Sequence, residues 1–313
     1  MKTFNTILEL CEKLSTETKC IEFFINLRWK DGVECPHCQS KKVYTLKNGK
    51  SFRCGNTECK ETFSIRTGTV MEASNISIKK WILAIYLATS NKKGISSVQL
   101  GKHIGISQQS AWFMLHRIRE AKGIKFNSSS SFSGTVEVDE CYVGGSESNK
   151  HINKKFKSEK SVIIGLVNRE TKQAKAFKID NADKECLLPK IGCNVKEKST
   201  IVTDSYHAYN NLRRNYTHKT VKHSANEYVR NELDLDGRVA FQVHTNTVEG
   251  FWSLVKRTIN GTHHWISKKH TNKYLAEMTM RYNSRETSEG LRLNDVLGNL
   301  NGRLSYKQLV VRV

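Results

Sequence analysis

Three acidic residues in the second half of the chain have the type and order needed to hold metal ions. Asp139 lies in a run with β-like alternation, residues 136–145, and Asp204 ends a second such run. Glu249 follows in a stretch with helical spacing. A lone aspartate at a strand end is usually a cap or turn residue, but two followed by a helical glutamate supply hard oxygen ligands for two Mg²⁺ ions. The pattern predicts phosphoryl transfer at a pair of Mg²⁺ or Mn²⁺ ions, without a covalent enzyme intermediate.

The stretch that carries Glu249, residues 244–257, divides by helical spacing into two stripes. The apolar stripe consists of Val248, Phe251, Trp252, Val255 and, just beyond, Ile259. The polar stripe consists of Asn246, Glu249, Ser253 and Lys256. This division predicts a buried helix that presents Glu249 and, two turns later, Lys256 at its exposed edge. The alternative is an ordinary amphipathic helix whose polar face is only solvated.

Four of the nine cysteines have the spacing of a zinc site. Cys35 and Cys38 form one close pair, and Cys54 and Cys59 form a second after fifteen residues, the length of a β-hairpin. Four thiolates in this arrangement predict a tetrahedral Zn²⁺ site of the zinc-ribbon type, within residues 31–70. With four protein ligands and no open position, the zinc is expected to be structural.

Three helices are expected next, at residues 77–88, 96–104 and 107–121, with a turn at Gly105. A short helix, a glycine turn and a longer helix resemble a helix-turn-helix, here assigned to residues 75–126. The side chains expected to face DNA are Gln108, Gln109, Ser110, Arg117 and Arg119. Glutamine can pair with adenine through two hydrogen bonds, which would let this helix read DNA. The alternative to a helix-turn-helix is a plain helical bundle that does not bind DNA.

The pattern changes to strands after a polar joint around residues 127–134. Strands are expected at 135–143, 161–167, 174–179, 199–204 and near 220–223, and helices at about 183–193, at 206–215 and from about 246. Residues 145–160 are expected to form a solvated loop. This order predicts an α/β domain of RNase H-like type over residues 133–290, with Asp139 on the central strand and Asp204 beside it. Residues 1–30 are expected to be a helical lead-in, and residues 291–313 a C-terminal tail.

The composition indicates which binding partner and which cellular location to expect for the protein. The 313 residues include 51 Lys and Arg against 30 Asp and Glu, a formal net charge of +21, which favours nucleic acid over an anionic membrane surface. No apolar run is long enough to span a membrane, and the first residues do not resemble a secretory signal. We therefore expect an intracellular protein with reduced thiols and no membrane partner.

Several longer motifs resemble a known family. They are residues 31–38 (DGVECPHC), 63–69 (FSIRTGT), 136–145 (VEVDECYVGG), 202–209 (VTDSYHAY), 244–256 (HTNTVEGFWSLVK), 261–265 (GTHHW), 269–270 (KH) and 281–283 (RYN). Together with the order of ribbon, helix-turn-helix and α/β domain, they resemble the IS1595-type (ISXO2-like) DDE transposases, relatives of the Merlin elements. The resemblance covers most of the chain from about residue 30 to 285.

The resemblance implies a transposase that binds the terminal inverted repeats of its element, then cuts and joins double-stranded DNA. The family's two aspartates fall on Asp139 and Asp204, and its third residue falls on Glu249 or, as a rival on the same stripe, on Asn246. A carboxylate binds Mg²⁺ better than an amide, which favours Glu249. Lys256 is then expected to hold a DNA phosphate, with Arg257 beside it.

The resemblance also implies a homodimer or larger assembly, because two DNA ends must be joined. The protein is expected in the cytoplasm and nucleoid of a prokaryote, or in the nucleus if the host is eukaryotic. The main alternative is a catalytically inactive, transposase-derived regulator that only binds DNA. A zinc-ribbon transcription factor with an unrelated α/β domain would leave the three acids unexplained.

Overall fold

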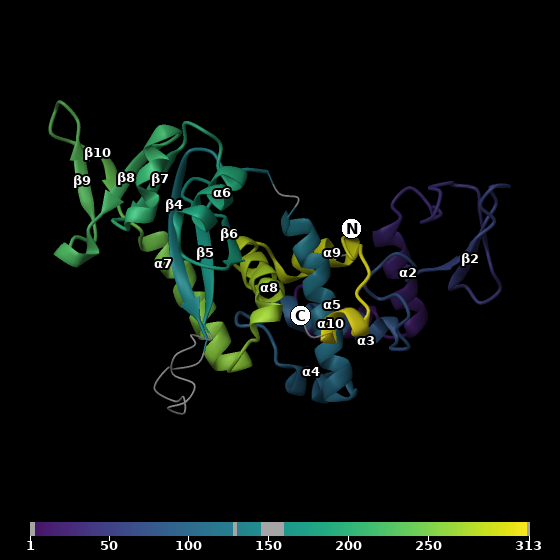
Figure 1. The fold of residues 1–313 in the computed structure, drawn as a ribbon. Coiled ribbons are helices and arrows are strands. Elements are labelled where there is room, and N and C mark those ends of the chain that lie inside the picture. Colours follow the sequence, from purple (N-terminus) through teal and green to yellow (C-terminus); the bar gives the residue numbers. More distant parts are fainter. Residues whose placement is uncertain (1–3, 128–129, 145–159, 312–313) are drawn as a thin grey trace. The chain divides into compact units, whose positions relative to one another are not determined.

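The computed structural model describes residues 4–127, 130–144 and 160–311, with the side chains of residues 124–127 excepted. The chain forms two compact units (Figure 1). The first unit combines Met1–Asn127 with Ser284–Val313, and the second is Ser128–Asn283. The sequence-based division placed residues 284–290 in the catalytic domain and the rest in a tail, whereas here residues 284–313 fold with the N-terminal unit. Among the described helices, none is long and apolar enough to cross a membrane.

The N-terminal part of the first unit contains two helices and a small sheet. Helices α1 (Ile7–Lys13) and α2 (Glu17–Arg28) begin at threonine caps, and strands β1 (Val43–Thr45), β2 (Ser51–Cys54) and β3 (Thr62–Ser64) form an antiparallel sheet. The rings of Trp29, Phe52 and Phe63 pack together in this sheet's core, with Trp29 and Phe52 5.7 Å apart. A core this small leaves the cysteines as the main additional support.

The rest of the first unit is helical. Helices α3 (Ile78–Ser90), α4 (Ser97–Ile104) and α5 (Gln108–Asn127) lie where helices were expected, and Gly105 ends α4 in the left-handed conformation at φ +62°. Two C-terminal helices, α9 (Glu289–Gly298) and α10 (Tyr306–Val310), complete the unit. Tyr86 of α3 donates a hydrogen bond of 2.5 Å to Glu289 of α9, which helps explain why the C-terminal segment belongs to this unit.

The second unit is built on a mixed sheet of five strands in the order β6-β5-β4-β7-β8. The strands are β4 (Thr135–Val143), β5 (Ser161–Asn168), β6 (Ala174–Ile179), β7 (Thr200–Asp204) and β8 (Thr217–Val221). Strand β5 is antiparallel to both of its neighbours, β4 and β6, whereas β7 and β8 run parallel to β4. Strand β4 is central, as predicted. The loop expected at residues 145–160 falls almost entirely outside the described residues.

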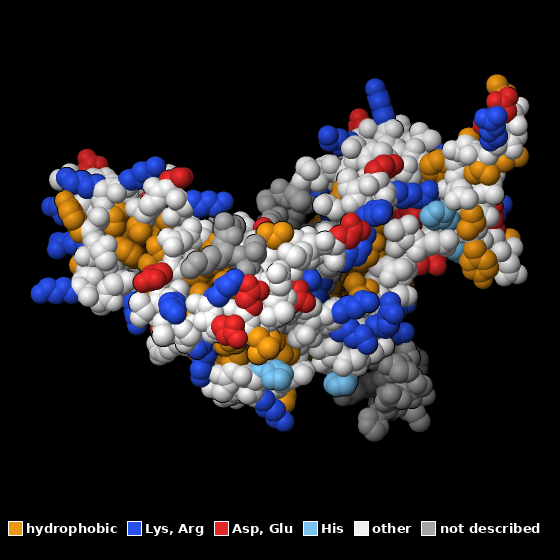
Figure 2. Space-filling view, turned by 180° about the vertical axis from the view of Figure 1, so that it is seen from behind, with side chains coloured by type: hydrophobic (Ala, Val, Ile, Leu, Met, Phe, Trp, Pro, Cys, Tyr) orange, Lys and Arg blue, Asp and Glu red, His pale blue; other side chains and the backbone are white. Residues whose placement is uncertain are grey.

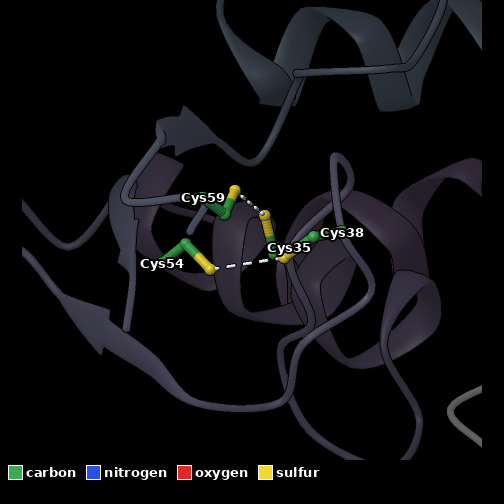
Figure 3. Close-up of side chains that lie close together, drawn as sticks. All are labelled: Cys35, Cys38, Cys54 and Cys59. Atoms are coloured by element: carbon green, nitrogen blue, oxygen red, sulfur yellow. Dashed lines mark hydrogen bonds between the residues drawn. The ribbon is translucent and has the colours of Figure 1, made fainter. Parts of the chain in front are cut away.

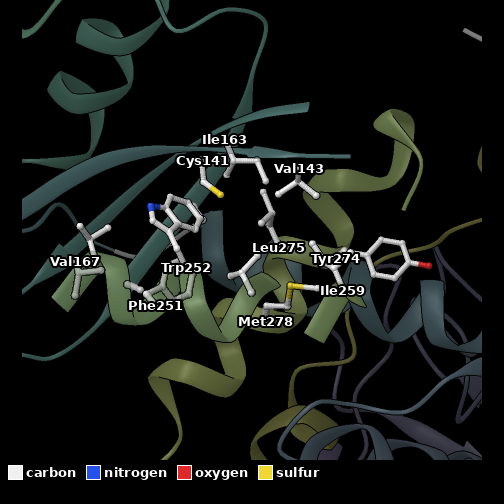
Figure 4. Packing of buried hydrophobic residues seen from close by; sticks show 14 of the residues in the cluster. Cys141, Val143, Ile163, Val167, Phe251, Trp252, Ile259, Tyr274, Leu275 and Met278 are labelled. Atoms are coloured by element: carbon white, nitrogen blue, oxygen red, sulfur yellow. The ribbon is translucent and has the colours of Figure 1, made fainter. Parts of the chain in front are cut away.

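Helices cover both faces of this sheet. On one face, α7 (Asn246–Thr258) and α8 (Thr271–Asn283) pack through Phe251, Trp252, Leu275 and Met278 (Figure 4). On the other face lie α6 (Lys184–Asn194) and the 3₁₀ helix η3 (His207–Arg214). Because strand side chains alternate between faces, Asp139 points to the side of α7 and Glu140 to the side of η3.

Two elements of the second unit were not expected from the sequence. Strands β9 (Arg230–Leu233) and β10 (Val239–Val243) form an antiparallel hairpin between β8 and α7. Val243 at its base is buried with Val202 and Val221, while most of the hairpin is exposed. The second unexpected element is at the C-terminal end of α7, where the helix continues into a π-helical turn, η5 (Ile259–His263).

Candidate active site and zinc centre

The four predicted zinc ligands come together in the first unit (Figure 3). The sulfur atoms of Cys35, Cys38, Cys54 and Cys59 all lie within 4.8 Å of one another, with Cys35 and Cys59 3.8 Å apart and Cys38 and Cys54 3.5 Å apart. Zn–S bonds of about 2.3 Å in a tetrahedron place sulfur atoms roughly 3.8 Å apart, so the cluster fits Zn²⁺ without rearrangement. A hydrogen bond with the backbone of Ser40 lowers the pKa of Cys38 to about 7, toward the thiolate form that binds metal.

Asp139 and Asp204 lie on neighbouring parallel strands, β4 and β7. The register pairs Glu137 with Val202, and continuing it by two residues brings Asp139 opposite Asp204 at the ends of the paired segments. Burial, with smaller contributions from the negative charges of Asp204 and Glu249, raises the pKa of Asp139 to about 6. Three carboxylates that repel one another in this way are a favourable site for divalent cations.

The carboxylate of Asp139 is oriented by Trp252 of α7. The indole Nε1 donates a hydrogen bond of 3.1 Å to Oδ2 of Asp139. The same indole ring lies against Gly165, the residue paired with Asp139 on β5. A Cβ atom at Gly165 would lie 2.4 Å from the ring of Trp252, so a side chain there would displace the tryptophan.

Asp204 and Glu249 also have fixed partners. The backbone N–H of Tyr206 donates a hydrogen bond of 3.0 Å to Oδ1 of Asp204. Oε1 of Glu249 accepts a hydrogen bond of 2.9 Å from Thr245 and lies 3.4 Å from Nε2 of His223. The side chain of Glu249 is about half exposed, and Asn246, at the first position of α7, is also exposed.

The three acids do not converge as tightly as the cysteines. Within the described parts of the chain, the Cys₄ cluster is the one group of at least three metal-binding side chains whose ligand atoms lie within 4.8 Å of one another. Two ions about 3.5–4 Å apart need ligands spread over a wider span than one ion does.

The structure gives Glu137 a role that the sequence did not reveal. This fully buried carboxylate accepts hydrogen bonds from the backbone N–H groups of Thr247 and Val248, at 2.8 and 2.9 Å, in the first turn of α7. A negative charge at a helix N-terminus is stabilising because it satisfies unpaired N–H groups and opposes the helix dipole. Glu137 thus fixes the start of the helix that carries Glu249. Its position on the same strand face as Asp139 was the only signal in the sequence.

Arg169 completes this anchor. Its Nε donates a hydrogen bond of 2.7 Å to Glu137, and its two terminal nitrogens each donate at 2.7 Å, to the carbonyl oxygens of Gln242 and His244. The guanidinium therefore holds the end of β10 and the start of α7 against β4. The pKa of His244, which lies beside this pair, is lowered by burial and then by Arg169.

Glu140, on the opposite face of β4, lies close behind the acidic site. It accepts a hydrogen bond from the hydroxyl of Tyr209. Burial raises the pKa of Glu140 to about 7, with smaller contributions from the charges of Asp204 and Asp139. A carboxyl group with this pKa is partly protonated at neutral pH, which limits the negative charge at the site.

The two basic residues at the end of α7, Lys256 and Arg257, are exposed. The ammonium of Lys256 lies near Cys141 on β4, where it partly offsets the rise in the thiol pKa that burial causes. Arg257 donates a hydrogen bond of 3.1 Å to the carbonyl of Ser253 on its own helix. Of the two, Lys256 is thus the one that lies beside the strand of Asp139.

The residues expected to face DNA from α5 divide into two groups. Gln108 and Gln109 are exposed and Ser110 is partly exposed, with Gln108 hydrogen-bonded to Ser97 of α4. Arg117 and Arg119 are buried, with Arg117 stacked on Phe113 and donating to the carbonyl of Leu304 at 3.2 Å. The structure therefore does not place these two arginines on a DNA-facing surface: the C-terminal segment contacts Arg117, and Arg119 is itself buried.

Comparison with known proteins agrees with this architecture. Residues 131–283 match the ISXO2-like transposase domain, and residues 15–62 match the transposase zinc-ribbon domain of the same family. A protein in transposable element ISH50 of Halobacterium salinarum is 26% identical over 282 residues, which cover 85% of this chain and 90% of the relative. The chain belongs to the IS1595 family of ISXO2-like transposases.

Proposed function

We propose that this transposase cuts DNA at the ends of its insertion element and joins the freed 3′-hydroxyl to target DNA, with Asp139, Asp204 and Glu249 holding two Mg²⁺ or Mn²⁺ ions. The observation that carries the proposal is the position of Asp139 and Asp204 just beyond the paired segments of the neighbouring parallel strands β4 and β7, where burial and the charge of Asp204 raise the pKa of Asp139 to about 6. Bound there, the ions would activate the attacking water or hydroxyl and stabilise the leaving oxygen.

The protein's own residues set the geometry of this reaction. Trp252 orients the carboxylate of Asp139, and the backbone of Tyr206 orients that of Asp204. Glu137 fixes the start of α7 and thereby the position of Glu249. Such preorganisation matters because small displacements of the reacting groups slow phosphoryl transfer strongly. Lys256 binds a phosphate of the DNA as a point charge.

Glu249 is proposed as the third metal ligand. Asn246 lies three residues earlier on the same helix face and is also exposed, so it is the competing assignment. A carboxylate is preferred over a neutral amide because Mg²⁺ is a hard cation that gains most from charged oxygen ligands. The contacts of Glu249 with Thr245 and His223 hold its carboxylate at the helix start, on the side of α7 that also carries Lys256.

DNA recognition is proposed for the first unit. The zinc ribbon and helices α4 and α5, in a helix-turn-helix arrangement over residues 75–126, bind the terminal repeats, with Gln108, Gln109 and Ser110 toward the bases. The net charge of +21 favours the phosphate backbone, and Lys and Arg side chains are spread over the face seen in Figure 2. Because two element ends must be joined, a homodimer or larger assembly is expected on the DNA.

The test is strand transfer of a labelled element-end duplex into plasmid DNA with Mg²⁺ or Mn²⁺. Asp139→Asn and Asp204→Asn should abolish joining while binding of the element end survives. Joining lost in Glu249→Gln but kept in Asn246→Ala supports Glu249 as the third ligand, and the reverse result moves that role to Asn246. Wild-type protein that binds ends but never cuts them would instead indicate a DNA-binding regulator.

A further inference from the structure

A small cavity lies at the end of β4, beyond the acidic site and within the second unit. Its volume is about 180 Å³, well below the roughly 300–1,000 Å³ of most small-molecule sites. Its lining includes Tyr142, Lys256, Asn260, His264 and Trp265. The cavity is therefore of a size for one planar ring system, and its walls combine aromatic, cationic and amide groups with apolar side chains, among them Ile259 and Ile266.

Two aromatic side chains on the rim of this cavity are unusually exposed. Trp265 is 64% exposed and Tyr142 is 54% exposed. Tryptophan is highly buried on average because its apolar surface is large, so an exposed one beside a cavity needs a reason. Ile259 and Ile266 are both buried, so the segment is anchored on either side of the exposed ring.

The backbone that presents Trp265 is strained. Helix α7 ends in the π-helical turn Ile259–His263, and π turns occur frequently at functional sites. The next residue, His264, has φ +58° and ψ −40°, a conformation that costs a non-glycine residue on the order of 1–3 kcal/mol. The ring of His263 packs edge-on against Tyr274, which helps hold the turn in place. The strained turn and the exposed indole are thus found at the same point of the chain.

The cavity is connected to the acidic site through Lys256 and β4. Lys256 lines the cavity and also lies near Cys141, two residues after Asp139. Val143, a further lining residue, is four residues after Asp139, or about 13 Å along the strand. Successive nucleotides of one DNA strand rise about 3.4 Å, so the cavity lies within roughly four nucleotides of a phosphate held at Asp139.

We infer that this cavity receives one unpaired base of the DNA strand next to the scissile phosphate, stacked on Trp265, with Lys256 on the adjoining phosphate. The inference rests on the proposed function and specifies the DNA that the enzyme binds: an element end in which one base is unstacked and rotated out of the duplex. Aromatic stacking binds any base, and the amide of Asn260 can donate and accept hydrogen bonds at the edge of the base. An enzyme working on a phosphodiester gains from holding the neighbouring nucleotide outside the duplex, because the strand is then fixed in position.

The experiment is a double-mutant cycle between Trp265 and single bases of the DNA. Binding of the full-length, zinc-loaded protein to element-end duplexes is measured without other divalent metal, so that no strand is cut. Each duplex carries one abasic residue, placed in turn at every position within four nucleotides of the cleavage site on either strand. Wild type is compared with Trp265→Ala and Trp265→Phe, and Tyr306→Ala serves as the control for an exposed aromatic residue in the first unit.

The expected result is that substitution of Trp265 and removal of a base are energetically coupled at only one position of the DNA. Trp265→Ala should weaken binding of the intact duplex about 5- to 100-fold, yet bind the duplex that lacks the stacked base as well as wild type does. Trp265→Phe should retain most of the affinity, and Tyr306→Ala should show no coupling at any position. Equal weakening on every abasic duplex would overturn the inference, because Trp265 would then contact the DNA without a particular base. Unchanged affinity in Trp265→Ala would overturn it as well.

Metal-dependent cleavage is measured in parallel, so that the two proposals can fail separately. Coupling at one base, together with a wild-type protein that does not cut, would contradict the proposed function and leave the base-binding cavity supported. Cleavage that depends on Asp139, without coupling between Trp265 and any base, would support the proposed function and overturn the base-binding cavity. Because Trp265 is largely exposed, its substitution should leave the melting temperature nearly unchanged, which checks that the variants are folded.

Discussion

The indole N–H of Trp252 donates a hydrogen bond to the carboxylate of Asp139, so an apolar core residue directly contacts the proposed metal site. Trp252 is 4% exposed and packs in the main core cluster of the second unit. The packing of α7 against the sheet therefore sets the orientation of a metal ligand. Changes in that core are expected to alter catalysis as well as stability.

Trp252→Phe keeps most of the apolar surface but removes the donor to Asp139. Because a hydrogen bond to the charged form lowers the pKa of a carboxyl group, its loss should raise that of Asp139 above about 6. Cleavage should fall about 3- to 10-fold at pH 7, and the loss should be greater at pH 6 than at pH 8. Cleavage rates against Mg²⁺ concentration at these pH values test this. The same loss at every pH, or an equal effect of Phe251→Leu, would indicate that Trp252 acts only through packing.

Asp139→Asn should stabilise the protein in the absence of divalent metal. The pKa of Asp139 is raised from an ordinary value of 3.8 to about 6, so folding favours the protonated form. The contribution of protonated Asp139 to the free energy of unfolding is fully present below about pH 4 and is lost as pH rises through about 6. A shift of roughly two units corresponds to about 1–3 kcal/mol at pH 7 to 8. Urea unfolding should show this gain for Asp139→Asn at pH 7 and little gain near pH 4, whereas Mg²⁺ should stabilise wild type more than the variant.

Glu137→Ala should loosen the start of α7. The substitution leaves the guanidinium of Arg169 without its buried partner and removes the acceptor for two backbone N–H groups, which together cost about 3–5 kcal/mol. Glu137→Gln keeps an acceptor oxygen and should lose less. Faster hydrogen exchange at the amides of Thr247 and Val248 would locate the effect. Glu197→Gln, which changes an exposed glutamate of the same unit, should shift stability by less than about 0.5 kcal/mol.

Removal of zinc should affect the first unit alone. A chelator, or Cys54→Ala, is expected to unfold the ribbon around β1 to β3, because its aromatic core is small, and to weaken binding to element ends. Bound zinc per chain and DNA affinity are measured before and after chelation, with Cys11→Ala as a matched control outside the cluster. DNA binding that survives full loss of zinc would exclude a role for the ribbon in recognition.

Local patterns in the sequence predicted much of this molecule. The cysteine spacing identified the zinc ribbon, which the sulfur cluster and the family comparison confirm. Strands β4 to β7 were predicted because their apolar alternation is strong and their boundaries carry polar residues. The two stripes of α7 likewise separated its buried residues from Glu249 and Lys256.

What the sequence did not reveal depends on contacts between distant segments. The β9–β10 hairpin has short strands that are mostly exposed, and although Val239, Phe241 and Val243 alternate along β10, such a short run does not show which segment it pairs with. Helix α5 is buried on several sides, and spacing alone could not show that Arg117 and Arg119 point inward. The role of Glu137 requires α7 to meet β4 across more than a hundred residues, which only the folded structure defines.

The C-terminal segment, residues 284–313, belongs to the same unit as the N-terminus, and this makes the second unit an insertion within the first. The chain crosses between the two units twice, so each is joined to the other by two covalent connections. Truncation after Asn283 would leave the sheet and its acids complete, but would remove α9 from α3 and uncover α5. The last thirty residues therefore matter for folding of the proposed DNA-recognition unit, although in the sequence they follow the segment that carries the proposed catalytic acids.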